Sequence, residues 1–203
     1  FISGISRNDT KVIIRKPDIN ETEKFDLDNL NYHSKRDYFK SGIKVCKDFG
    51  FKFSRGFECE IRSEIPIKAG TSSSSSIMVG WINFLSQNAE NPKLLDAKSI
   101  AELAYKAEVI EFESPGGMMD QYSTSVGDLI YLESEPQIKV ERIDRALGAF
   151  VLGDSLEQKD TIGILSRCRD SRLSIMNEMK KFDPGVNFQT ISSDQLDQFE
   201  LDD

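Results

Sequence analysis

The sequence is poor in the residues on which zinc sites and disulfide frameworks depend. Its 203 residues include one histidine, His33, and three cysteines at unrelated spacings, Cys46, Cys59 and Cys168. No C-x-x-C pair is present. A Cys/His zinc site and a disulfide-stapled fold are therefore not expected, and the cysteines are expected to be reduced thiols of structural importance only.

Long hydrophobic runs and basic clusters are also missing. No apolar run approaches the ~18 residues of a membrane span, and the first residues lack the order of a signal peptide. The chain carries 34 acidic and 26 basic residues, a net charge of −8, without a dense Lys/Arg cluster. Nucleic acid and membranes are therefore not expected as partners. We expect a cytoplasmic globular protein that is a monomer or a homodimer.

Apolar residues follow strand and helix periods in mixed order, which predicts an α+β fold. The region after Phe57 alternates apolar and polar residues as far as Ile67, and Ser99 opens a capping-box match at the start of a helix. The expected strands are 11–15, 25–27, 57–67, 128–132 and 148–152, and the expected helices are 36–49, 77–85, 99–111 and one through Leu173, Met176 and Met179.

Five consecutive serines, Ser72 to Ser76, form the most informative segment. An isolated serine run is typical of a flexible linker. This run instead joins an apolar strand to the first turn of an apolar helix, and Gly70 permits an unusual turn before it. In that setting the loop N–H groups and the helix N-terminus can bind phosphate, and hydroxyls can reach Mg²⁺.

A second segment, Glu113 to Tyr122, places an aspartate just after a Pro-Gly-Gly sequence. One interpretation is a helix terminator followed by an ordinary surface residue. The other is functional, because paired glycines let the backbone approach a ligand and a fixed carboxylate can accept a proton from an alcohol. Asp120 is the candidate base in the second interpretation.

Both segments resemble motifs of one enzyme family. The stretch from Pro66 to Ser76 is similar to the P-x-x-x-G-L-x-S-S-A phosphate-binding motif of the GHMP small-molecule kinases, with Thr71 in place of Leu and Ser75 in place of Ala. The second segment resembles the galactokinase signature C-G-I-M-D-Q-F. Gly117, Met119, Asp120 and Gln121 match that signature, whereas Gly116, Met118 and Tyr122 differ from it.

The resemblance implies an ATP-dependent sugar kinase that uses Mg²⁺. Asp120 would be the catalytic base, Gly116 and Gly117 would contact the sugar together with Asp120, and Ser74 would reach Mg²⁺. The ATP phosphates would be held by Gly70, Ser72, Ser73, Ser74 and Ser75. The implied fold has a ribosomal-protein-S5-like β/α N-terminal domain over 1–140, lacking its first strands, and the start of a C-terminal α+β domain over 141–203.

The family's R-x-x-x-x-G-E-H-x-D-Y and K-x-T-G-A-G-x-G-G motifs are absent from the sequence. The chain therefore resembles the middle of a longer kinase. No tyrosine follows Tyr131, so the sugar-stacking tyrosine that galactokinases carry in the region after residue 153 has no counterpart. Two alternatives remain open: a GHMP kinase for a different sugar or alcohol, and a catalytically silent sensor of sugar and ATP.

Overall fold

The structure is a computed structural model that describes the chain except for residues 35, 68, 154–159, 189–190, 197–198 and 200–203. It divides into two compact units, Phe1–Lys159 and Asp160–Asp203. The domain boundary expected at 140/141 stays a prediction.

A four-stranded sheet forms one layer of the first unit. Its strands are β1 (Ile2–Ser6), β2 (Lys11–Lys16), β3 (Glu21–Asp26) and β4 (Phe57–Ile61), in the order β1-β4-β2-β3. β2 and β4 run parallel, and the other two pairs are antiparallel. The buried side chains alternate along β2 and β4, which places Val12, Ile14, Phe57, Cys59 and Ile61 in the core.

β4 ends at Ile61, so the expected strand to Ile67 is too long. Pro66 has no N–H for a sheet ladder, and the Ile67 side chain is exposed. The apolar alternation beyond Ile61 therefore belongs to the loop that leads into the serine run.

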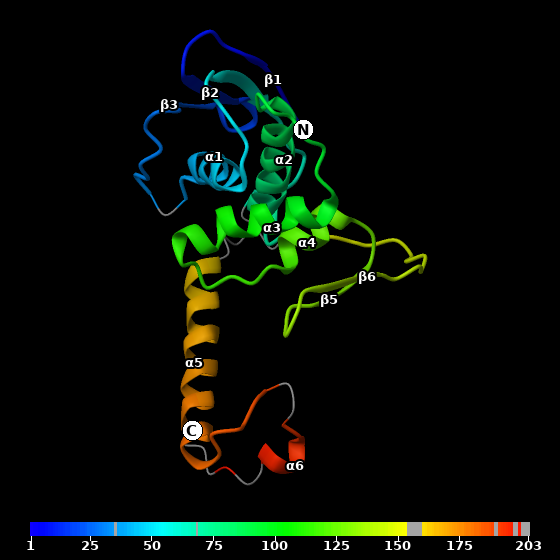
Figure 1. The fold of residues 1–203 in the computed structure, drawn as a ribbon. Helices are drawn as coiled ribbons and strands as arrows, with labels where there is room; N and C mark the ends of the chain where they lie inside the picture. Colours follow the sequence, from blue (N-terminus) through cyan, green and yellow to red (C-terminus); the bar gives the residue numbers. More distant parts are fainter. Residues whose placement is uncertain (35, 68, 154–159, 189–190, 197–198, 200–203) are drawn as a thin grey trace. The chain divides into compact units, whose positions relative to one another are not determined.

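Four helices complete the core. They are α1 (Tyr38–Phe49), α2 (Ser73–Asn88), α3 (Ala97–Glu108) and α4 (Met119–Val126). Figure 1 shows α1 and α2 next to the sheet, with α3 and α4 on the side of these helices that faces away from it. The helix expected over 36–49 is confirmed, and it ends at Gly50 in the left-handed conformation (φ 109°).

The start of α3 differs from the expected capping box. The N-cap is Asp96, whose Oδ1 accepts a hydrogen bond from the Ser99 backbone amide at 2.8 Å. The hydrogen bond from the Ser99 amide lowers the pKa of Asp96 below its ordinary value. Ser99 is therefore the third residue of the helix and not its cap. Asp96 takes the capping role, because its side chain accepts the hydrogen bond of the Ser99 amide.

The core is centred on Trp81, the only tryptophan in the chain. Its indole Nε1 donates to the Phe39 carbonyl oxygen at 3.0 Å. The ring stacks on Phe84 with centroids 5.5 Å apart and meets Phe57 edge-on at 5.5 Å. Aromatic contacts therefore join α1, β4 and α2 around one buried indole.

Gly42 of α1 lies against this indole, and its replacement is the first testable change. A Cβ at Gly42 would lie 2.5 Å from Trp81 Cδ1. The indole is packed against other rings, so we expect Gly42→Ala to lower the free energy of unfolding by about 1–3 kcal/mol. This is the net loss expected after the ~1 kcal/mol that alanine gains over glycine in a helix interior. Urea denaturation followed by circular dichroism measures it.

Gly80→Ala on α2 is the matched control. A Cβ there would meet only the Ile2 side chain, at 3.5 Å. We expect this variant to be as stable as the native protein or more stable. Equal stability of the two variants would contradict the packing argument.

After α4 the first unit continues as a hairpin of β5 (Ile130–Glu133) and β6 (Lys139–Arg142). The strand expected at 128–132 is confirmed as a strand, with the bounds Ile130–Glu133. The strand expected at 148–152 is wrong, because these residues lie outside every strand and Phe150 and Val151 are 81% and 95% exposed. No strand of the described residues pairs with this segment, so its apolar sequence has no sheet to join.

The second unit consists of α5 (Thr161–Phe182), the following turn and α6 (Ser193–Leu196). Asp160 caps α5, with its Oδ1 accepting from the Gly163 amide at 3.0 Å. Met179 is fully buried, and the helix expected through Leu173, Met176 and Met179 is confirmed. No helix within the described ranges has the length and apolar character needed to cross a membrane.

Candidate functional site

The serine run is the first turn of α2 and the residue before it. Ser72 is the N-cap, in the left-handed conformation with φ 54°, and Ser73 to Ser76 are helical. Gly70, with φ 77°, supplies the turn that precedes the cap. The run is therefore part of a folded helix and not a linker.

The loop leaves a helix N-terminus without a side-chain cap among the residues the structure describes. Thr71 Oγ1 donates to the Pro66 carbonyl oxygen at 3.0 Å, which closes the loop on itself. Gly70 and Ser74 are exposed, Ser72 and Ser73 are half-buried, and Ser75 is buried. The partial positive charge and free N–H groups of such a terminus suit an anion.

The second motif forms the loop and first turn that begin α4. Asp120 lies in that first turn, and its carboxyl-bearing side chain is exposed. Ser123 Oγ donates to the Asp120 backbone carbonyl at 3.2 Å, a contact within the same helix. The carboxylate of Asp120 is thus on a regular helix and accessible, as a proton acceptor has to be.

Gly116 and Gly117 precede this turn with open space around them. A Cβ at Gly117 would meet no atom within 4 Å, and one at Gly116 would meet only the Val109 side chain, at 3.6 Å. Neither glycine has a positive φ. The fold itself therefore does not require glycine at 117, and the free space there is available to a ligand.

The two motifs meet through Gln121, the residue after Asp120. Its Nε2 donates to Ser75 Oγ at 3.3 Å and to Glu108 Oε2 at 2.6 Å. All three side chains are buried. The structure thus brings α4 and α2 together at their first turns, although the two motifs are 46 residues apart.

Glu108 is a functional candidate that the sequence analysis did not identify. It is a buried carboxylate at the last position of α3. Burial, followed by the charge of Glu108, raises the pKa of Tyr38. The signal in the sequence is an acidic residue that falls four positions after Ala104, on the face of α3 expected to be apolar.

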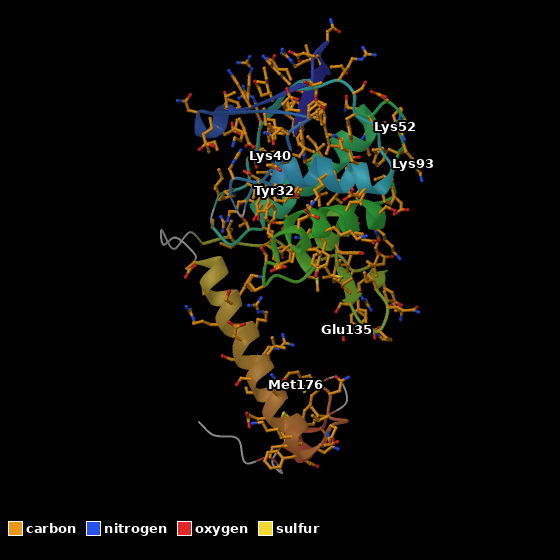
Figure 2. The ribbon with its side chains drawn as sticks, turned by 60° about the vertical axis from the view of Figure 1, so that its left-hand side comes forward. Tyr32, Lys40, Lys52, Lys93, Glu135 and Met176 are labelled. Atoms are coloured by element: carbon orange, nitrogen blue, oxygen red, sulfur yellow. The ribbon has the colours of Figure 1, made fainter. Side chains whose placement is uncertain are left out.

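Lys40, which is labelled in Figure 2, has a buried side chain and contacts the segment before α1. Lys40 Nζ donates to the Asn31 carbonyl oxygen at 3.0 Å and pairs with Asp37 at 3.3 Å. Tyr32, also labelled in Figure 2, donates to Glu111 at 2.6 Å and packs on Phe112 with centroids 5.0 Å apart. These contacts tie Asn31 and Asp37 to α1, and Tyr32 to the residues that follow α3.

Two further observations concern metal ligands and the position of the cavity relative to the site. Within the described part of the chain, no group of three or more His, Cys, Asp or Glu side chains could hold a metal ion. A cavity of about 520 Å³ lies between β1 and α2, lined by Ile2, Ile65, Ser76, Gly80 and others. It reaches the end of the serine run but not Asp120, Gly116 or Gly117, so we place the candidate chemistry at the open helix termini and not in this cavity.

Comparison with known proteins shows which family part of the chain resembles. Residues 37–128 match the family described as GHMP kinases N terminal domain. The galactokinase of Staphylococcus carnosus is 32% identical over 128 residues, covering 60% of this chain and 32% of its own. That of Pyrococcus furiosus is 33% identical over 129 residues, covering 62% and 36%. The chain therefore spans about a third of the length of these relatives.

Solved structures show the same fold. Lactococcus lactis galactokinase, solved with galactose, superposes with a TM-score of 0.76 at 20% identity, covering 98% of this chain and 53% of its own. Methanococcus jannaschii mevalonate kinase gives 0.58 at 24% identity, covering 71% and 45%. The α+β, GHMP-kinase-like fold expected from the sequence is confirmed. Residues 37–128 of this chain therefore match the GHMP kinase N-terminal domain, and the sequence is similar to that of galactokinases.

Proposed function

We propose that this chain carries the phosphate loop and the catalytic base of an ATP-dependent sugar kinase. One observation supports this most directly: the hydrogen bond from Gln121 to Ser75 joins the helix of Asp120 to the helix of the serine run. A kinase requires its acceptor-activating group and its phosphate-binding group side by side, because positioning supplies much of its catalysis.

In the proposed reaction Asp120 orients a sugar hydroxyl and accepts its proton while that oxygen attacks the γ-phosphorus of ATP. Gly116 and Gly117 contact the sugar, and ADP leaves. The loop residues Gly70, Ser72, Ser73 and Ser74 hold the phosphates with N–H and hydroxyl donors. Ser75 belongs to the same proposed set, and its buried hydroxyl faces Gln121, so its contribution would come through the loop backbone.

Mg²⁺ fits the donors that the site provides. Hydroxyl and carboxylate oxygens are the ligands it prefers, and ligand phosphates usually complete its shell. Ser74 is exposed at the loop and Glu108 is a buried carboxylate with one oxygen engaged by Gln121. We propose these two residues as its protein ligands. When bound, Mg²⁺ neutralises charge that develops on the phosphate oxygens.

ADP release measured across a panel of sugars and alcohols tests the proposal on the native protein. We expect turnover that depends on ATP, on Mg²⁺ and on one hexose, with galactose the first to test because the relatives are galactokinases. Turnover with mevalonate instead would favour another GHMP kinase. Calorimetric binding of ATP and sugar without ADP release would favour the sensor and overturn the catalytic proposal.

Gly117→Ala separates a ligand contact from a structural need for glycine. Because an added Cβ there meets no protein atom within 4 Å, we expect native stability. If the sugar lies against this backbone, the methyl group should displace it and raise the KM for sugar by about tenfold or more, since a small misplacement is enough to disturb a reacting geometry. Steady-state kinetics and thermal unfolding of the same sample measure both.

Gly148→Ala serves as the control, because an added Cβ there also meets nothing within 4 Å and the residue is outside the two motifs. An unchanged KM in Gly117→Ala would remove Gly117 from the proposed sugar contacts.

A further inference from the structure

Gln121 forms a buried polar junction between three helices. Its side chain is 2% exposed, although the preceding residue, Asp120, is exposed. The amide nitrogen donates to Glu108 of α3 at 2.6 Å and to Ser75 of α2 at 3.3 Å. A buried amide is costly unless it is hydrogen-bonded, so its partners determine where this turn of α4 can lie.

The chemistry of the partners fixes the orientation of the amide. Glu108 provides a carboxylate oxygen, which accepts only, so the NH₂ group has to face it. A flipped amide would place Oε1 against that oxygen, with two acceptors in contact. The short bond to the carboxylate is of the charge-assisted kind, which is stronger than a neutral hydrogen bond.

The other end of the amide has no partner in the part of the chain that the structure describes. Gln121 Oε1 is the one buried side-chain nitrogen or oxygen without a hydrogen bond among the described residues. A group that served packing alone would be better replaced by an apolar side chain of similar size, since a half-satisfied buried amide is unfavourable. The two bonds of the amide nitrogen therefore point to a role in orientation.

We propose that Gln121 is a positioning residue that couples the first turn of α4 to the first turn of α2. It is buried and does not touch substrate. By holding Glu108 and Ser75 with one nitrogen, it fixes the backbone that carries Asp120 relative to the phosphate loop. The catalytic consequence rests on the proposed kinase function, whereas the coupling of the two turns does not.

Gln121→Met tests the proposal, because methionine has a similar volume and no hydrogen-bonding amide. We expect this variant to have a kcat about 10- to 100-fold below that of the native protein, because misplacing a reacting group by about 1 Å can cost that much. The KM for ATP should change by a smaller factor than kcat, because the loop and Glu108 keep their own donors and acceptors and lose only their bond to Gln121. A purely structural role would instead lower the folded fraction and leave kcat per folded molecule unchanged, and that result would overturn the positioning role.

Hydrogen exchange provides a readout that does not require turnover. In Gln121→Met we expect exchange to rise about tenfold at the first hydrogen-bonded amides of both helices, over 76–77 and 122–123, as local opening becomes easier. Faster exchange in α4 alone, or no change, would overturn the coupling. Gln87→Met, the same substitution at an exposed position of α2, is the control and should alter neither exchange nor kcat.

The two proposals fail in different ways. If the native protein releases no ADP with any acceptor, the kinase function fails, and the exchange experiment still decides whether Gln121 couples the two turns. If the native protein turns over and Gln121→Met has native kcat, only the positioning role fails.

Discussion

Asp120→Asn is expected to lower kcat for the sugar by about 100- to 10,000-fold, the range that a positioned general base contributes. Asparagine has nearly the same shape but cannot accept the hydroxyl proton as a carboxylate does. The exposed Asp120 side chain makes no hydrogen bond or ion pair in the described residues that the substitution would break. The free energy of unfolding should fall by less than about 1 kcal/mol, mainly through the lost charge at the N-terminus of α4.

The measurement is single-turnover phosphoryl transfer, together with ATP affinity by calorimetry. ATP affinity should be retained, because the phosphate loop is unchanged. Asp48→Asn removes an exposed carboxylate from α1 and should leave kcat at the native level. If Asp120→Asn keeps kcat within about threefold of native, Asp120 is not the base, since general-base catalysis is worth far more.

Trp81→Ala is expected to cost about 3–5 kcal/mol of stability, the range for removal of a large buried aromatic side chain. The indole touches rings from three elements and is fully buried. Its loss also removes the indole N–H that donates to the Phe39 carbonyl. Domains of this kind are stable by only about 5–15 kcal/mol, so we expect a large part of the variant to be unfolded at physiological temperature.

Denaturant titration followed by far-UV circular dichroism measures this change, because Trp81 is the only tryptophan and its fluorescence is lost with it. Trp81→Phe keeps a ring in the core and should cost less. Phe1→Ala removes an aromatic side chain that is 80% exposed and should cost under about 0.5 kcal/mol. A similar loss for Trp81→Ala and Phe1→Ala would show that the indole does not organise this core.

The fold was predictable from sequence where the spacing of apolar residues and the residues that end an element indicate the same element. α1 has its apolar period and a glycine stop, and both were confirmed. The strand expected at 148–152 was wrong because a strand requires a partner, and apolar composition alone does not provide one. β1 was missed because Gly4 and the exposed Ile5 interrupt its alternation, and its place in the sheet comes from pairing with β4, far along the chain.

The candidate site was predictable in its motifs but not in its connections. The serine run and Asp120 were identified from short segments, and whether each binds or reacts stays a prediction. Glu108 was missed because a helix period describes which positions are buried and cannot tell why one of them is acidic. The bond between Gln121 and Ser75 depends on how α2, α3 and α4 pack, which no single segment encodes.

The pairing of β1 with β4 also has a consequence for the order in which the protein folds. Ile2 lies opposite Ile61. β2 pairs with β4, although α1 separates these two strands in the sequence. During synthesis β1 is therefore without its partner until residue 61 has left the ribosome, whereas the β2–β3 hairpin can close as soon as it emerges. The last step in assembling the sheet is the insertion of β4 between two strands that were made earlier. The segment that follows β4 leads into the serine run proposed to bind phosphate, so that run takes its place only after the insertion.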